Sequence, residues 1–379
     1  MKPTPALVAT AGLLALAVAM GVGRFAFTPI LPMMQADAGL TLAAAGWLAA
    51  ANYLGYLVGA LGAARLSTAW AVRGGLVLIA LVTFGMGIAH GFAAQLTLRL
   101  VAGIASAWVL VHVSIWALAW LSTLQRPAAS GVVFAGVGAG IAGAGLLCMW
   151  MMQAGIDADR TWQVFGAISL VLVVPIWPAF GRQPQPATAT PGLPAARRAR
   201  WHADQWRLIV CYGAYGFGYI IPATFLPAMA HQYISNPVVF GWAWPIFGLA
   251  AALSTWGVSR WLHANNIRRL WAACYLLMAA GVVLPVLWPS LVAILLAALL
   301  VGGTFMVVTM LGLREGRRIA GADATAFMAA LTAAFAVTQV LGPLAVSAVA
   351  GVAHGLAAAL SLAALVLIWS AAILWRSAR

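Results

Sequence analysis

Arginine and histidine side chains inside apolar stretches are the groups in this sequence that can do chemistry. Arg24 lies well inside the first apolar stretch, Arg99 lies about one turn into the fourth, and His112 follows in that same stretch. A guanidinium forks onto a carboxylate, and cations without a nearby acid attract anions strongly in a low-dielectric site. These residues therefore predict an electropositive cavity that favours an anionic ligand.

Arg24 is the most informative of these residues. A charged side chain inside a membrane costs at least about 2.5–3.5 kcal/mol on insertion scales, so it needs a partner or a water-filled cavity. Contact with an anion meets that need. The alternatives are snorkelling to the outer head groups and bonding to backbone carbonyls near Pro29 and Pro32. Arg99 lies only about one turn into its stretch, so snorkelling is an interpretation for it as well.

The sequence contains six acidic residues, and all of them lie in loops or at the ends of apolar stretches. Proton-coupled carriers commonly use a buried carboxylate, which is missing here. Three interpretations stay open. His112 carries the proton, since histidine titrates near physiological pH; Asp37 does so from the outer mouth; or no proton is coupled, as in a uniporter or an anion exchanger. An ordinary hydrogen-bonded core histidine is the alternative for His112.

Other polar and aromatic side chains share helix faces with these residues. Asn52 and Tyr56 are four residues apart and so lie on one face, where they line a cavity or else join helices. The predicted substrate-binding residues are Arg24, Phe27, Asn52, Tyr56, Trp108, His112, Tyr215, Tyr219, Trp244 and Gln339. The predicted coupling or gating residues are Arg99, His112, Asp37 and Arg65.

The elements that must position these side chains are membrane helices. The chain has 379 residues, of which 64% are hydrophobic and 7% are charged, whereas charged residues make up about 25% of a soluble domain. Apolar stretches of about 20 residues are long enough to cross a bilayer. We predict twelve such spans in an all-α membrane protein, at residues 7–33, 41–64, 74–90, 94–122, 128–152, 161–180, 206–231, 239–262, 269–288, 290–313, 324–350 and 355–376.

The net charge of +14 is arranged by topology. Almost all the basic residues fall at the termini or in every second loop, and the opposite loops hold Arg160 beside two acids. This positive-inside pattern predicts that both termini are cytoplasmic, in a bacterial-type inner membrane, and argues against nucleic-acid binding. The cysteines Cys148, Cys211 and Cys274 are isolated inside spans, so neither a disulfide framework nor a metal site is indicated. We expect no cofactor.

A repeat divides the chain into two halves. Moved along by 195 residues, Gly21 falls on Gly216 and Arg65 on Arg260, and the register holds without a gap for more than fifty positions. We predict a six-span half at residues 1–180, a cytoplasmic linker at 181–205 and a second half at 206–379, in parallel orientation as in some secondary carriers. The fifth span is rich in glycine, which predicts close helix packing, either alone or together with a sliding surface between the halves.

Two motifs resemble the major facilitator superfamily. Leu96, Arg99 and Gly103 match its fourth-span pattern, and Gly62, Arg65 and Arg73 match part of the signature in the loop after its second span. The resemblance implies a six-plus-six fold, an interior-facing Arg99 and a cytoplasmic gate near Arg65. This sequence departs from the signature, because no acid lies between Gly62 and Arg73.

Longer stretches are similar to particular groups within that superfamily. The glycine-rich stretch 131–145 is similar to the fifth-span motif of its antiporters but lacks the proline, so the direction of transport stays open. Residues 21–34 and 46–60 are similar to the YbfB-type branch. The resemblance covers the whole chain and implies little about the substrate.

These observations predict a secondary active transporter for a small organic solute, most simply an anion, working by alternating access with or without protons. The alternative is an efflux pump for apolar or cationic compounds. An enzyme is not expected, because no clustered His, Asp or Cys pattern is present, and no GxxxxGK[ST] loop indicates an ATP-driven pump. The expected partners are the substrate, membrane lipids and, if coupled, protons. We expect a monomer.

Overall fold

The computed structural model describes residues 3–89, 91–181, 201–231, 242–261, 267–349 and 355–378. All regular structure in these residues is helical, which confirms the predicted all-α fold. The first half contains α1 (Pro5–Leu16), η1 (Ala17–Phe25), α2 (Phe27–Ala38), α3 (Leu42–Ala63), α4 (Thr68–Met86), α5 (Phe92–Thr123), α6 (Ser130–Gln153) and α7 (Ala158–Ile176). The second half contains α8 (Ala203–His231), α10 (Ala243–Trp261), α11 (Ile267–Leu287), α12 (Leu291–Ala320), α13 (Ala324–Val349) and α14 (Gly355–Arg376).

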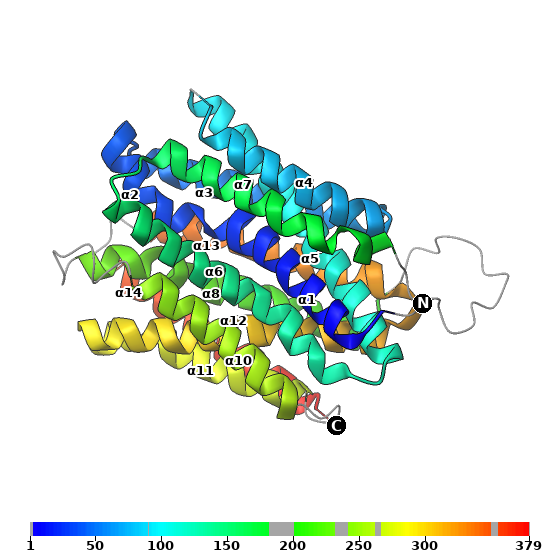
Figure 1. Cartoon of the computed structure of the whole chain (residues 1–379). Coiled ribbons are helices and arrows are strands. Elements are labelled where there is room, and N and C mark those ends of the chain that lie inside the picture. The colour runs from blue at the N-terminus through cyan, green and yellow to red at the C-terminus, as the bar shows by residue number, and fades with distance from the viewer. Residues whose placement is uncertain are drawn as a thin grey trace.

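The helices correspond to the predicted spans. Ten helical segments in the described residues are long and apolar enough to cross a membrane, and the first of them joins α1, η1 and α2 into Pro5–Ala38. The helices α8 and α10 stand where the seventh and eighth spans are predicted. Most of the predicted linker, at residues 182–200, lies outside the described residues. The two ends of the chain lie at the same end of the bundle (Figure 1).

Polar residues begin several of these helices. The side chains of Thr41, Ser67, Asp157 and Ser290 each accept a hydrogen bond from a backbone N–H in the first turn that follows. Such N-caps satisfy donors that an apolar helix start would leave unpaired. The apolar runs behind the caps then supply the lipid-facing and buried surfaces, so the chain alternates between short polar turns and long apolar helices.

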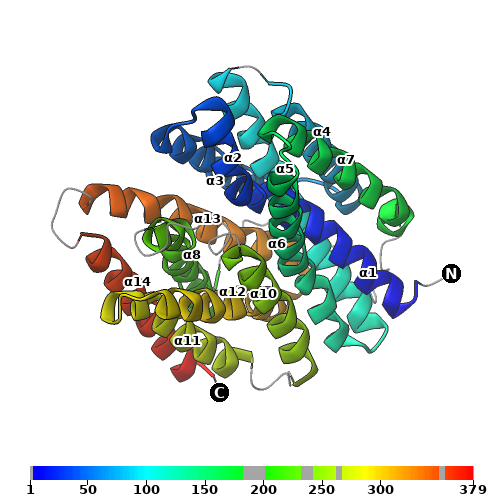
Figure 2. The same cartoon turned by 60° about the vertical axis from the view of Figure 1, so that its left-hand side comes forward.

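Helix pairing is the same in the two halves. In the first half α3 packs on α5, α4 on α7, and α1 with η1 on α6; in the second half α10 packs on α12, α11 on α14, and α8 on α13. In the described residues the halves meet mainly through α6 with α10 and α3 with α13, with smaller contacts of α12 on α5 and α6 and of α13 on α5. Figure 2 shows the blue-to-green first half and the green-to-red second half on either side of this interface.

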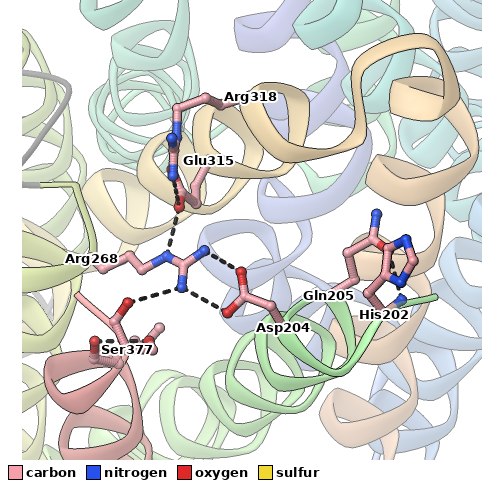
Figure 3. Close-up of polar contacts among 8 residues, drawn as sticks. His202, Asp204, Gln205, Arg268, Glu315, Arg318 and Ser377 are labelled. Carbon is pink, nitrogen blue, oxygen red and sulfur yellow. Dashed lines mark hydrogen bonds and ion pairs between the residues drawn. The ribbon is translucent and has the colours of Figure 1, made fainter. Parts of the chain in front are cut away.

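An ion-pair cluster joins the helices of the second half at the end of the bundle that carries both termini, here called the basic end (Figure 3). Arg268 of α11 donates to the two carboxylate oxygens of Asp204 at 2.8 and 2.5 Å and to Glu315 at 2.6 Å. Arg318 donates to the same Glu315 carboxylate at 2.7 and 2.8 Å. The buried acid Glu315 is therefore paired twice, and α8, α11 and α12 are held together.

Two other arginines of α12 reach into the first half at this end. Arg317 Nη1 donates to the carbonyl of Ile115 at 2.9 Å, and Arg314 Nη1 lies 3.4 Å from the hydroxyl of Ser130. A buried apolar cluster at the same junction joins α3, α5 and α13 and consists of Ala63, Val111 and Ala329. The two halves are thus in direct contact at the basic end.

Candidate functional site

Arg24 is buried where the two halves meet. Its exposed fraction is 3%, and it donates a hydrogen bond to Gln339 Oε1 of α13. The guanidinium carbon lies 4.0 Å from the centre of the Tyr56 ring and 5.5 and 5.6 Å from those of Phe25 and Phe335. Such cation–π contacts contribute about 0.5–2 kcal/mol each. In the described residues no carboxylate forms an ion pair with Arg24, so its charge faces an amide and aromatic rings.

An irregular turn of the first span places Arg24. Residues Ala17–Phe25 form the π-helix η1, a geometry that is rare and often lies at functional sites. Three side chains of α3 and α5 donate to carbonyls of η1: Ser106 at 2.8 Å, Asn52 at 3.3 Å and Arg99 at 3.4 Å. Asn52 also donates to the carbonyl of Arg99 at 3.0 Å. These bonds fix the backbone that carries Arg24.

Aromatic rings from both halves pack on one another next to Arg24, and those of Phe25, Tyr56 and Phe335 contact its guanidinium. We call the set Phe25, Tyr56, Tyr215, Tyr219, Phe305 and Phe335 the aromatic box. Tyr219 stacks on Phe305 at 5.0 Å, Tyr215 lies 4.9 Å from Phe335, and Phe25 meets Phe305 edge-on at 6.0 Å. Offset and edge-to-face pairs of this kind are the favourable ones. The box therefore joins η1 and α3 of the first half to α8, α12 and α13 of the second.

A small cavity lies inside this arrangement, here called the central cavity. Its lining consists of Met20, Arg24, Phe25, Tyr56, Leu110, Tyr212, Tyr215, Phe305, Met306, Thr309 and Phe335. Both halves contribute to it, and the Arg24 guanidinium is its one charged group among the described residues. The remaining lining is apolar or aromatic except for hydroxyl groups. The volume of the cavity is about 10 Å³, which is room for about one water molecule. The rings therefore close on Arg24 in this conformation, and an organic ligand fits only when they move apart.

Buried donors are in surplus around the central cavity. Several buried nitrogens near the cavity have no hydrogen-bond partner among the described residues: Arg24 Nε and Nη1, Arg99 Nε, Gln339 Nε2 and Trp244 Nε1. The Asn52 Oδ1 acceptor is likewise unpaired among the described residues. A buried donor without an acceptor costs about 1–3 kcal/mol, and more when it is charged. An anion supplies acceptors and the opposite charge together.

Most of the predicted binding residues come together here. Arg24, Tyr56, Tyr215, Tyr219 and Gln339 lie in or against the aromatic box, and Asn52 is bonded beneath it. Trp244 lies 6.4 Å from Phe25. Phe27 and Arg99 form an adjacent pair, with the Arg99 guanidinium carbon 4.7 Å from the Phe27 ring centre.

The other predicted residues lie elsewhere. His112 Nε2 lies 2.9 Å from the carbonyl of Ala63 and Nδ1 lies 3.2 Å from the hydroxyl of Thr68, so both ring nitrogens have protein partners outside the cavity lining. Trp108 packs on Trp70 at 5.5 Å. Asp37 accepts from the backbone N–H of Ala158 at 2.7 Å and so caps α7. Arg65 is exposed in the turn after α3.

Sequence reasoning missed Phe305, Phe335 and Thr309 as site residues. Phe335 stands four residues before Gln339, so the two share a helix face, and that spacing was an available signal. Phe305 and Thr309 have the same spacing on α12, but nothing in the sequence separates that phenylalanine from the many others in apolar stretches. Among the described residues no three His, Cys, Asp or Glu side chains gather as a metal site.

The fold is that of a major facilitator transporter. The structure of the human organic anion transporter MFSD10 (TETRAN) matches with a TM-score of 0.74 over 98% of this chain and 100% of that chain, at 18% sequence identity. Likeness at this identity shows the fold alone. A relative from Bacillus subtilis (strain 168), the uncharacterized MFS-type transporter YceJ, is 32% identical over 166 residues, which span 41% of this chain and 40% of that protein.

The family described as "Uncharacterised MFS-type transporter YbfB" matches residues 16–375. The chain belongs to this family of major facilitator transporters. The resemblance stated from the sequence is therefore confirmed, and with it the prediction of a multi-pass membrane transporter.

Proposed function

We propose that this transporter carries small organic anions across the membrane by alternating access, with Arg24 as the group that binds the anion. The observation that carries the proposal is the surplus of buried donors around Arg24 in a cavity shared by both halves. A hydrogen bond between ions of opposite charge is short and strong in such surroundings. The human transporter of the same fold is described as an organic anion transporter, which agrees with the proposal.

The two halves contribute different parts of the binding site. Arg24 comes from η1 of the first half and Gln339 from α13 of the second, and they are bonded to each other. A carboxylate that binds Arg24 also brings an acceptor to the unpaired Gln339 Nε2. An anion is then held by both halves at once, so its arrival and departure are linked to their relative movement.

The membrane arrangement belongs to the same proposal. The basic end faces the cytoplasm by the positive-inside rule, in a bacterial-type inner membrane. The proposal does not require coupling to protons, because the six acids lie at or near helix ends and the ring nitrogens of His112 are bonded to Ala63 and Thr68. Exchange or uniport of the anion needs no titrating residue in the central cavity.

The test is replacement of Arg24 in the purified, detergent-solubilised protein. We expect Arg24→Gln to weaken binding of organic carboxylates about ten- to a hundredfold, because a hydrogen bond to a charged group contributes about 1.5–3 kcal/mol. Binding is measured as the ligand-induced rise in melting temperature. Arg160→Gln is the matched control, since the Arg160 side chain is 75% exposed.

Retained carboxylate binding in a folded Arg24→Gln protein would contradict the proposal. Stabilisation by lipophilic cations in place of carboxylates would contradict it as well and would favour efflux of cationic or apolar compounds. Arg24→Lys separates charge from shape. It keeps the charge without the planar fork, so partial binding by this variant agrees with a carboxylate ligand.

A further inference from the structure

The chemistry of the central cavity narrows the class of anion. We infer that the substrate is an aromatic monocarboxylate without an ammonium group, with its carboxylate at Arg24 and Gln339 and its ring in the aromatic box. This inference rests on the proposed function and makes it more specific. It is supported by the set of charged residues at the cavity and by the aromatic residues that line it.

Among the described residues, Arg24 is the one arginine that lines the central cavity. Arg99, the other deeply buried arginine, lies outside the lining, where it covers Phe27 at 4.7 Å and donates to the carbonyl of Arg24. A second carboxylate on the ligand would be buried without a cation of its own, which is strongly unfavourable. The cavity therefore fits a monoanion better than a dianion.

Among the described residues no carboxylate lines the cavity to pair with an ammonium group. The acids of this chain all lie at or near helix ends, where they are exposed, cap a helix or pair with arginine: Asp37, Asp157, Asp159, Asp204, Glu315 and Asp323. An ammonium group beside Arg24 would meet a like charge and no carboxylate. Juxtaposed like charges discriminate against a ligand, so an amino acid is a poor fit.

Ring faces form most of the remaining wall. The Tyr215 hydroxyl is engaged by the carbonyl of Phe305 at 2.9 Å and the hydroxyl of Thr309 at 3.1 Å, which leaves its ring as the contact surface. The Phe335 ring lies beside the Tyr215 ring, and the Phe305 ring stacks on that of Tyr219. An aromatic ligand gains from offset and edge-to-face contacts with such rings, whereas a short polar anion leaves them unused.

Gln339 is the residue that keeps this site open to an anion. Its oxygen accepts from Arg24 and its Nε2 has no acceptor among the described residues. A glutamate has nearly the same shape but places a permanent carboxylate against Arg24. Gln339→Glu therefore supplies from the protein the group that we assign to the ligand.

The experiment compares five small compounds on the full-length protein in detergent by thermal shift: benzoate, acetate, phthalate, phenylalanine and benzylamine. Benzoate has one carboxylate and a ring; acetate removes the ring, phthalate adds a carboxylate, phenylalanine adds an ammonium group and benzylamine reverses the charge. We expect benzoate to bind with an apparent Kd at least about tenfold lower than each of the other four.

Two variants complete the test. Gln339→Glu is expected to weaken benzoate binding by at least about tenfold, since Arg24 is then neutralised from within. Gln95→Glu is the matched control, because it adds the same charge near the start of α5, away from the cavity lining. The comparison of compounds on the unaltered protein decides the inference even if Gln339→Glu fails to fold.

The outcomes separate this inference from the proposed function. If acetate, phthalate or phenylalanine binds as tightly as benzoate and Arg24→Gln abolishes that binding, the aromatic monocarboxylate is wrong and the anion transporter stands. If benzoate binding is unchanged in folded Gln339→Glu, the assignment of the carboxylate to this pair is wrong. Stabilisation by benzylamine, or by none of the compounds, overturns the inference together with the proposed function.

Discussion

Arg24 and His112 are both ionisable side chains inside helices, and their surroundings differ in one respect. Two nitrogens of Arg24 have no hydrogen-bond partner among the described residues, and the centre of the Tyr56 ring lies 4.0 Å from its guanidinium carbon. His112 has a partner on each ring nitrogen, in the carbonyl of Ala63 and the hydroxyl of Thr68. A buried polar side chain whose bonds are complete stabilises a fold, and one with donors to spare can bind a ligand.

For His112 we therefore expect a structural effect. His112→Ala removes the bonds from α5 to the end of α3 and the start of α4, at about 0.5–1.5 kcal/mol each, so thermal unfolding should occur at a lower temperature while carboxylate binding stays unchanged. The control is His202→Ala at an exposed position. A normal melting temperature together with a lost pH dependence of uptake would instead make His112 a proton site.

The sequence could predict that these side chains lie inside the membrane, because each is a single ionisable residue within a long apolar stretch. It could not predict their partners. His112 bonds to a backbone carbonyl, and Asn52 and Arg99 donate to carbonyls of η1. Because every residue type has a backbone carbonyl, the sequence does not indicate which one is the partner. The same reason hides the role of Asp37, whose partner is the backbone N–H of Ala158.

Among the helices, α6 shows how one element serves two interfaces. Gly131, Gly138 and Gly145 are seven residues apart and face α10, where added Cβ atoms would collide with that helix. Gly136 and Gly140 face α1 and η1 in the same manner. The glycine-rich sequence predicted close packing, as small residues do in membranes, but not which glycines meet which helix, since that depends on the rotation of α6.

Whether a Gly→Ala change raises or lowers the free energy of unfolding should therefore depend on the face of α6 that carries the glycine. In Gly138→Ala the new Cβ lies 2.5 Å from the carbonyl oxygen of Gly248 and 3.0 Å from the Ala251 carbonyl carbon, and overpacking of this kind costs about 1–3 kcal/mol. Gly143→Ala is the control, because nothing lies within 4 Å of its Cβ. It should be neutral or more stable by up to about 1 kcal/mol through helix propensity. Equal melting temperatures for the two variants would contradict the tight α6–α10 contact.

At the scale of the whole molecule, the chain combines two six-span halves that are in direct contact at the basic end. Twelve spans and a repeat can be predicted from the sequence, because the lengths of the apolar stretches and the constant offset of 195 residues are visible in it. The sequence cannot predict which end of the bundle is closed, since open and closed conformations of a carrier use the same helices and differ by a few contacts. Here those contacts include Arg317 with Ile115 and Arg314 with Ser130.

The arginines of α12 allow a test of that closure. Arg317 bonds across to the first half, whereas Arg318 bonds to Glu315 of its own helix. The test introduces Ala329→Cys in the buried cluster between the halves and labels it from the basic end with a membrane-impermeant maleimide. The native cysteines Cys148, Cys211 and Cys274 are buried, so they add little background labelling. Loss of a hydrogen bond from a charged group shifts the balance by about 1.5–3 kcal/mol, so Arg317→Ala should raise the labelling rate at least about tenfold. Arg318→Ala is the control and should leave the rate unchanged. If both variants label alike, closure does not depend on the bond to Ile115, and the apolar cluster alone holds the halves together.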